Sequence, residues 1–210
     1  MQKLLTIYHH IKNDSLYRNS VFLLINTVIL AFFGFFFWAI CTRVFSTEDI
    51  GIATTLISSV DLVAVFALLG LNVSVIRYLP KSENKNSSIN SVLITVGITA
   101  IIGSIIYVIG INRFAPELSF IKSNKIFVFA FGLFVVFTCW SQILKNIFRA
   151  YLSTQYVVLK NSIFNILKIG FIFVFTSLGA FGILTSWMTA LTIAVLISII
   201  ILIHTFGYRP

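Results

Sequence analysis

Two charged side chains lie inside stretches of the chain that are otherwise apolar, and they are the first candidates for chemistry. Asp61 lies near the middle of residues 46–85, and Lys168 lies about halfway through residues 156–176. A charge at the centre of a bilayer costs about 2.5–3.5 kcal/mol on insertion scales, so each charge needs a partner or a water-filled cavity. Their similar depth suggests a structural ion pair. The alternative is a role in transport, in which either charge couples movement to protons or to the membrane potential.

Further polar residues recur at helical spacing within three of the apolar segments. Steps of three and four place each set on one face of a helix. Such a face is buried in protein or faces water, because lipid offers polar groups no partner. The sets are Thr54, Ser58, Asp61 and Asn72 in the first segment, Gln142, Asn146 and Arg149 in the second, and Asn161, Asn165 and Lys168 in the third.

The titratable residues do not assemble into a catalytic or metal-binding set. The chain holds only six acids, and no Ser nucleophile with a base or His and Glu pair on one helix is found among its residues. His9 and His10 are adjacent and therefore point to different faces of a helix, and Cys41 and Cys139 are isolated from each other. The sequence predicts no enzyme, no metal site and no cofactor.

The elements that must position these residues are membrane-spanning helices. Hydrophobic residues make up 59% of the chain and charged residues 10%, against about 25% charged in a soluble domain. About 20 apolar residues cross a bilayer. We therefore expect an all-α membrane protein with a bundle of about six transmembrane helices over residues 20–204. The predicted spans are 20–42, 47–79, 89–111, 126–146, 156–176 and 181–203, after an interfacial segment over 1–19 and before a tail or linker over 205–210.

The basic residues predict how the bundle is oriented. The net charge of +9 does not indicate nucleic-acid binding, because Lys and Arg are spread over short segments between the spans. With a cytoplasmic N-terminus, the inner segments hold ten cations and the outer loops four, which predicts both termini in the cytoplasm. The inner set is Lys3, Lys12, Arg18, Arg77, Lys81, Lys85, Lys145, Arg149, Lys160 and Arg209, and the outer set is Arg43, Arg113, Lys122 and Lys125.

The motifs between residues 18 and 80 resemble a known family. The first span is entered through Arg18-Asn19-Ser20 and ends in Arg43-Val44-Phe45-Ser46, and residues 48–53 read EDIGIA. The run LGLNVSVIRYLP over residues 69–80 strengthens the match, and a later basic loop holds Arg149-Ala150-Tyr151-Leu152. Together they resemble the Wzx-like polysaccharide flippases of the multidrug/oligosaccharidyl-lipid/polysaccharide exporter superfamily, in their N-terminal half.

The resemblance implies a flippase of the cell membrane, which moves a lipid-linked oligosaccharide of the polyprenyl-pyrophosphate type to the outer leaflet for surface polysaccharide synthesis. Family members have two six-helix lobes that alternate in opening around a central cavity. This chain matches one lobe, so the resemblance implies a second copy or a second six-helix lobe as partner, beside membrane lipids and the lipid-linked oligosaccharide.

A carrier for such a lipid needs a wet groove with cations and amides. Charge-assisted donors suit the pyrophosphate, and amides suit the sugar hydroxyls. The groove candidates, for substrate or coupling, are Asn26, Asp61, Asn72, Asn161, Asn165 and Lys168, and the pyrophosphate candidates are Arg18, Arg77, Lys145 and Arg149. For these four cations, setting the membrane topology is the alternative role.

Three other functions stay open at this point. A multidrug exporter of the same superfamily would share the fold but carry a more apolar cavity. A membrane-embedded enzyme would need a catalytic set that the sequence does not supply. A non-transporting membrane subunit or an inactive half-transporter fragment would bind a protein partner and no lipid-linked sugar.

Overall fold

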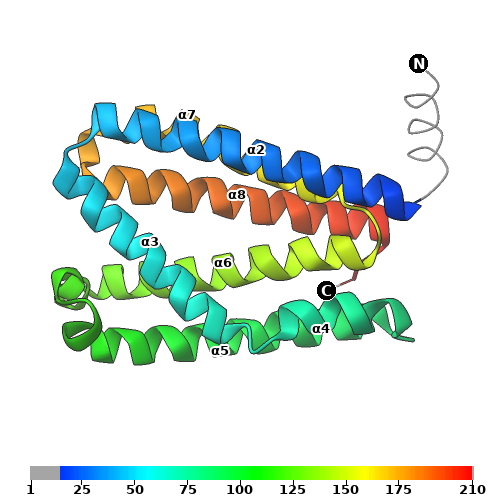
Figure 1. Ribbon diagram of the computed structural model, residues 1–210. Coiled ribbons are helices and arrows are strands. Elements are labelled where there is room, and N and C mark those ends of the chain that lie inside the picture. The colour runs from blue at the N-terminus through cyan, green and yellow to red at the C-terminus, as the bar shows by residue number, and fades with distance from the viewer. Residues whose placement is uncertain (1–14, 210) are drawn as a thin grey trace, which may run out of the picture.

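The computed structural model describes residues 15–209 and consists of helices (Figure 1). Six helices in this part of the chain are long and apolar enough to cross a membrane, which confirms the predicted all-α membrane class. Residues 1–14 lie outside the described part, and with them His9, His10 and most of the predicted interfacial segment. The helices are α2 Ser15–Val44, α3 Thr47–Ala67, α4 Leu71–Tyr78, α5 Lys85–Phe114, α6 Lys125–Ala150, α7 Gln155–Val174 and α8 Ala180–Phe206, with short 3-10 turns at Leu79–Lys81, Pro116–Ser123 and Thr176–Leu178.

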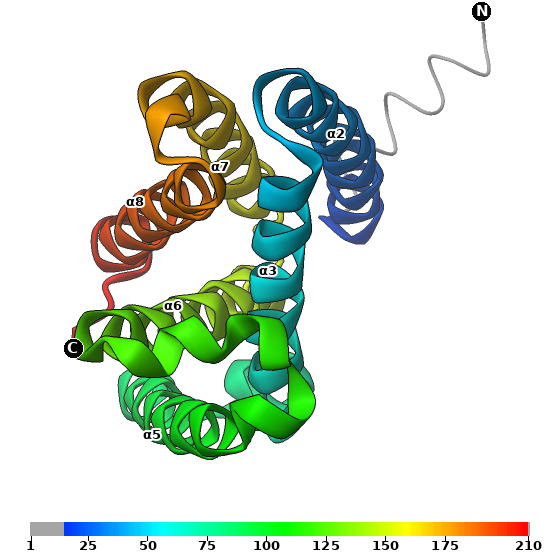
Figure 2. The same cartoon turned by 90° about the vertical axis from the view of Figure 1, so that its left-hand side faces the viewer.

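The helices form two groups that α3 joins. Helices α2, α7 and α8 pack together on one side, and α4, α5 and α6 on the other (Figure 2). Helix α3 runs obliquely from the end of α2 to the start of α4 and touches α5, α6 and α8 on the way (Figure 1). Because α6 also contacts α8, the two groups share one buried core around α3, α6 and α8.

The start of α2 differs from the prediction, because the helix begins at Ser15 rather than near Ser20. The side chain of Asn19 is buried, and its Oδ1 accepts a hydrogen bond of 2.9 Å from the backbone N–H of Thr154. Thr154 lies in the turn between α6 and α7. This contact ties the first helical turns of α2 to the bundle, so residues 15–19 belong to the spanning helix.

The start of α3 is capped as its sequence indicates. Ser46 Oγ accepts the backbone N–H of Asp49 at 3.1 Å and donates to Asp49 Oδ2 at 2.7 Å. Asp49 Oδ1 also accepts the backbone N–H of Ala180 at 2.8 Å, so one carboxylate serves the first turns of both α3 and α8. Gly179 precedes Ala180 with φ +56°, and a Cβ there would lie 2.8 Å from Asp49 Oδ1. Glycine is therefore required where α8 approaches α3.

The second span is not the single helix expected over residues 47–79. Helix α3 ends at Ala67, and Leu69 and Gly70 adopt positive φ angles of 47° and 75° before α4 begins. A break inside a membrane is tolerated only where neighbouring groups satisfy the freed backbone. Leu71 N–H bonds to Leu68 O, so Ala67 O loses its helical donor, and Thr99 Oγ1 on α5 donates to it at 2.6 Å. Asn146 Nδ2 on α6 donates to Asn72 O at 2.8 Å and ties the first turn of α4 to α6. The continuous helix was a wrong prediction because these partners come from distant parts of the chain.

We expect Thr99→Val to destabilise the protein, because it removes the hydroxyl that satisfies Ala67 O at the break. The predicted loss in the free energy of unfolding is about 0.6–2 kcal/mol, measured as a lower unfolding midpoint in detergent. Thr95→Val, one turn earlier on α5 at an exposed position without a recorded side-chain hydrogen bond, is the matched control. Equal effects of the two substitutions would contradict the role given to Thr99.

Candidate functional site

A polar cavity of about 420 Å³ lies between the two groups of helices. Helices α2, α3, α6, α7 and α8 each contribute to its wall. Its polar lining residues are Asn26, Thr27, Asp61, Thr138, Ser141, Gln142, Lys145, Arg149, Lys160 and Asn161. A cavity of this polarity inside an apolar bundle indicates a binding site for a polar group, because hydrocarbon cannot solvate such a wall.

The deepest cation of the cavity is Lys160 on α7, which is only 4% exposed. Its ammonium donates to the backbone O of Ser141 at 2.9 Å and to Ser141 Oγ at 2.6 Å, both on α6. An ammonium has three N–H donors, so these two bonds leave one for another group. Lys160 therefore joins α6 to α7 and also brings a positive charge to the cavity wall.

Two further cations of the cavity, Lys145 and Arg149, lie one turn apart on α6. Lys145 donates to Gln142 Oε1, and Arg149 Nη1 donates to Asn146 Oδ1 at 3.3 Å. Arg149 Nε is buried and has no hydrogen-bond partner within the described residues. Since the three cations form no recorded ion pair with a carboxylate in the described part of the chain, their charge is open to an anion.

Two buried amides on α2 and α7 belong to the neutral part of the wall. Asn161 Nδ2 on α7 donates to Asn26 Oδ1 on α2 at 2.6 Å, and both side chains are buried. Asp61 lines the same cavity from α3 with an exposed side chain. The cavity thus combines three cations, one carboxylate and a pair of amides, and no group of His, Cys, Asp and Glu suited to a metal ion is found in residues 15–209.

The expected ion pair of Asp61 and Lys168 was a wrong prediction. Lys168 is 3% exposed, and its ammonium lies 4.2 Å from the ring centroids of Phe37 and Trp187 and 5.0 Å from that of Phe164. Aromatic faces attract a cation electrostatically. Phe164 and Trp187 also line the cavity, so the rings that hold the Lys168 ammonium belong to the cavity wall.

The structure brings together five of the ten residues predicted from sequence, namely Asn26, Asp61, Lys145, Arg149 and Asn161. The other five do not line the cavity: Asn165 donates to Asn161 O within α7, Lys168 lies among aromatic rings, Asn72 offers its backbone O to Asn146, and Arg18 and Arg77 are exposed. Arg18 lies at the start of α2 and Arg77 near the end of α4.

Lys160 was not among the residues predicted for the site, because the sequence placed it only among the inner basic residues. The available signal was spacing, because Lys160 lies two steps of four before Lys168 and directly before Asn161. That spacing places it on the same side of α7 as the other buried polar residues. Gln142 and Ser141, on the polar side of α6, complete its surroundings.

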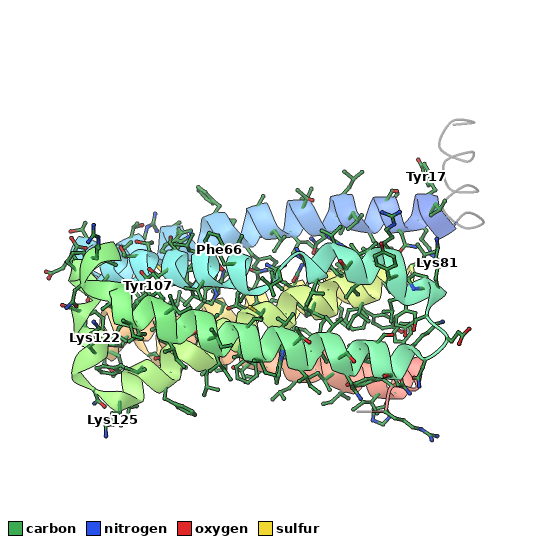
Figure 3. The ribbon with its side chains drawn as sticks, turned by 90° about the horizontal axis from the view of Figure 1, so that it is seen from below. Tyr17, Phe66, Lys81, Tyr107, Lys122 and Lys125 are labelled. Carbon is green, nitrogen blue, oxygen red and sulfur yellow. The ribbon has the colours of Figure 1, made fainter. Side chains whose placement is uncertain are left out.

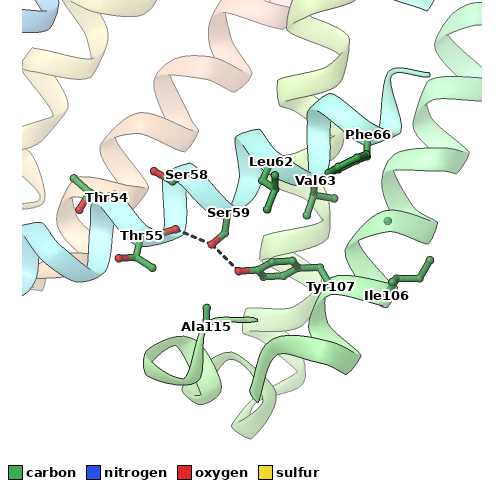
Figure 4. Close-up of a pocket in the computed structure, with 11 residues that line it drawn as sticks. Thr54, Thr55, Ser58, Ser59, Leu62, Val63, Phe66, Ile106, Tyr107 and Ala115 are labelled. Atoms are coloured by element: carbon green, nitrogen blue, oxygen red, sulfur yellow. Dashed lines mark hydrogen bonds between the residues drawn. The ribbon is translucent and has the colours of Figure 1, made fainter. Parts of the chain in front are cut away.

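A larger hollow of about 770 Å³ lies between α3 and α5, and its lining has no charged residue (Figure 4). Thr54, Thr55 and Ser59 donate their hydroxyl protons to backbone carbonyls one turn earlier, at 2.7–2.9 Å. Tyr107 OH donates to Ser59 Oγ at 2.7 Å across the hollow. Because these oxygens offer mainly acceptor lone pairs, this hollow does not suit an anion. The smaller cavity, which three cations line, is therefore the candidate site for an anion.

We expect Asp61→Asn and Lys168→Met to act additively on the free energy of unfolding, because the two side chains are not in contact. The coupling energy in a double-mutant cycle should lie within about 0.5 kcal/mol of zero. Lys160→Met with Ser141→Ala is the positive control, since these residues share a hydrogen bond and contacting pairs couple by about 0.5–3 kcal/mol. Strong coupling between Asp61 and Lys168 would restore the ion pair.

Comparison with known proteins identifies the family to which the chain belongs. No curated protein and no solved structure matches it. A family model described as polysaccharide biosynthesis protein matches residues 16–210, which covers nearly the whole chain and all the helices that line the cavity. The chain belongs to the polysaccharide biosynthesis protein family, that of the Wzx-like flippases, and is a multi-pass membrane protein of this family.

Proposed function

We propose that the chain is a lobe of a flippase that moves a polyprenyl-pyrophosphate-linked oligosaccharide across the cytoplasmic membrane by alternating access. The observation that carries this proposal is the convergence of Lys145, Arg149 and Lys160 on one cavity, without a carboxylate paired to any of them. The family and its apolar helices support the coarser statement, a membrane transporter.

The chemistry of the cavity wall suits the three parts of such a lipid differently. Pyrophosphate is an anion with several acceptor oxygens, which suits the buried unpartnered Nε of Arg149 and the remaining N–H of Lys160. Sugar hydroxyls both donate and accept, which suits the amides of Asn26 and Asn161. The polyprenyl tail needs no polar partner and stays in the lipid around the bundle.

The charge distribution supports an orientation with both termini in the cytoplasm. Figure 3 shows Lys81 at one end of the bundle and Lys122 and Lys125 at the opposite end. Arg18 lies at the same end as Lys81, where α2 begins. The basic residues of the first end outnumber those of the second. In this orientation, a lipid-linked sugar enters from the cytoplasmic leaflet near Arg149. A second six-helix lobe or a second copy of the chain would face Asp61 and close the cavity.

A multidrug exporter is the second candidate, and the aromatic rings and carboxylate of the cavity are what favour it. Trp187, Phe164 and Asp61 would attract an organic cation. Three cations in the same cavity repel such a ligand, and for this reason we rank the flippase first.

We expect Arg149→Gln and Lys160→Met to weaken binding of a fluorescent short-chain polyprenyl-pyrophosphate disaccharide to the purified protein. Each lost charge-assisted hydrogen bond is worth about 1.5–3 kcal/mol, which corresponds to roughly 10- to 150-fold in the dissociation constant. Arg43→Gln, an exposed arginine at the opposite end of the bundle, is the matched control and should leave binding unchanged.

Competition separates the candidate functions. Displacement of the disaccharide lipid by free pyrophosphate agrees with the proposal, whereas tighter binding of a cationic dye, lost in Asp61→Asn, favours a multidrug exporter. Binding of neither ligand, together with a stable protein partner, favours a non-transporting subunit. Turnover of a polyprenyl phosphate by the purified protein would indicate an enzyme.

A further inference from the structure

A third hollow, of about 360 Å³, lies at the basic end of the bundle between α4, α5 and α6. It is separate from the cation-lined cavity and shares no lining residue with it. The residues that line it include Tyr78, Leu79, Lys81, Ser82, Ser88 and Ile147.

The break at Gly70 explains why this hollow exists. After the break, α4 packs against α6 and touches α5 only lightly. The space between α4 and α5 has an apolar floor, in which Ile147, Ile89 and Leu79 are at most 4% exposed. A straight continuation of α3 would not place α4 in this position, so the broken helix and the hollow belong together.

The rim of the hollow is polar and basic. Lys81 lies on it in an exposed position, at the end of the bundle that also carries Tyr17 (Figure 3). Lys81 is the one charged residue among those that line the hollow, so the charge at its rim is positive. Tyr78 also lines the rim with an exposed ring, as expected of a residue at the boundary between lipid and water.

Two hydroxyls face each other on the same rim. Ser82 Oγ and Ser88 Oγ lie 2.7 Å apart, and either can be the donor. Ser88 Oγ also lies 3.1 Å from Asn84 O, to which it donates. When Ser88 gives its proton to Ser82 instead, the Ser82 hydroxyl is available as a donor beside the Lys81 ammonium. A hydroxyl and an ammonium are a suitable pair of donors for a phosphate oxygen.

We propose that this hollow binds an anionic phospholipid of the adjacent leaflet, with the phosphate at Lys81 and Ser82 and the start of an acyl chain on the floor near Ile89. The basic rim provides the charge complementarity, since basic residues near a membrane surface attract anionic headgroups. The apolar part of the lining favours a lipid over a free phosphate, because an inorganic ion would leave the exposed ring of Tyr78 and the half-buried Val92 uncovered. The site is independent of the sugar-lipid cavity and of the proposed transport.

The experiment titrates the full-length protein in detergent with phosphatidylglycerol or with phosphatidylcholine of the same acyl chains, and counts bound lipids by native mass spectrometry. We expect one phosphatidylglycerol to bind more tightly than phosphatidylcholine. Lys81→Gln should weaken it about five-fold, the effect of one basic residue at a membrane surface. Lys85→Gln is the matched control, because the Lys85 ammonium lies 5.6 Å from the centroid of the Tyr151 ring and does not line the hollow.

A second pair of variants tests the hollow itself without changing charge. Ser88→Leu places an apolar side chain at the rim and should abolish the tight phosphatidylglycerol site, whereas Ser87→Leu, at an exposed neighbour that does not line the hollow, should keep it. Equal binding of both lipids, or unchanged binding in Lys81→Gln and Ser88→Leu, would overturn the proposal. Displacement of the lipid by soluble glycerol phosphate at similar concentration would assign the site to a free phosphate instead.

Discussion

The structure depends on one constraint, which is that hydrocarbon offers no hydrogen-bond partner to a polar group. Each buried donor and acceptor must therefore be satisfied by another part of the protein. At the break between α3 and α4, Thr99 on α5 supplies the missing donor to Ala67 O, and Asn146 on α6 donates to Asn72 O in the first turn of α4. The same requirement explains why the buried Asn19 side chain holds the turn after α6. At the other end of the bundle, Asp49 links the starts of α3 and α8 by hydrogen bonds to both. The polar contacts thereby determine which helices meet.

The cation-lined cavity shows where this requirement is only partly met. Lys160 makes two hydrogen bonds to Ser141, but Arg149 keeps a buried Nε without a partner among the described residues. Leaving a buried donor unsatisfied costs about 1–3 kcal/mol, and more for a charged group. A protein tolerates such a cost at a functional site, where a ligand can supply the missing acceptor. The buried ammonium of Lys168 is stabilised differently, because it lies over the faces of three aromatic rings.

The break in the second span influences where the functional surfaces of the protein lie. Before the break, Ile57, Val60 and Asp61 of α3 line the cavity between the two groups of helices. Because α4 starts again at Leu71 and packs on α6, a hollow opens beside α5 at the basic end. Glycine at position 70, with its positive φ, therefore contributes to the hollow at the basic end.

The sequence by itself determined the class, the number of candidate spans and the polar faces, because hydropathy and helical spacing are local properties that a single segment carries. It also located five of the residues that line the cavity, since each belongs to a polar face or to a polar position in a span. Only the tertiary structure decided which faces meet. Asp61 and Lys168 each lie about halfway along a predicted span, yet the packing of α7 places the Lys168 ammonium between the rings of Phe37 and Trp187. The break at Gly70 and the role of Lys160 were decided in the same way, because their partners, Thr99 and Ser141, are separated from them in the chain and come near only when the helices pack.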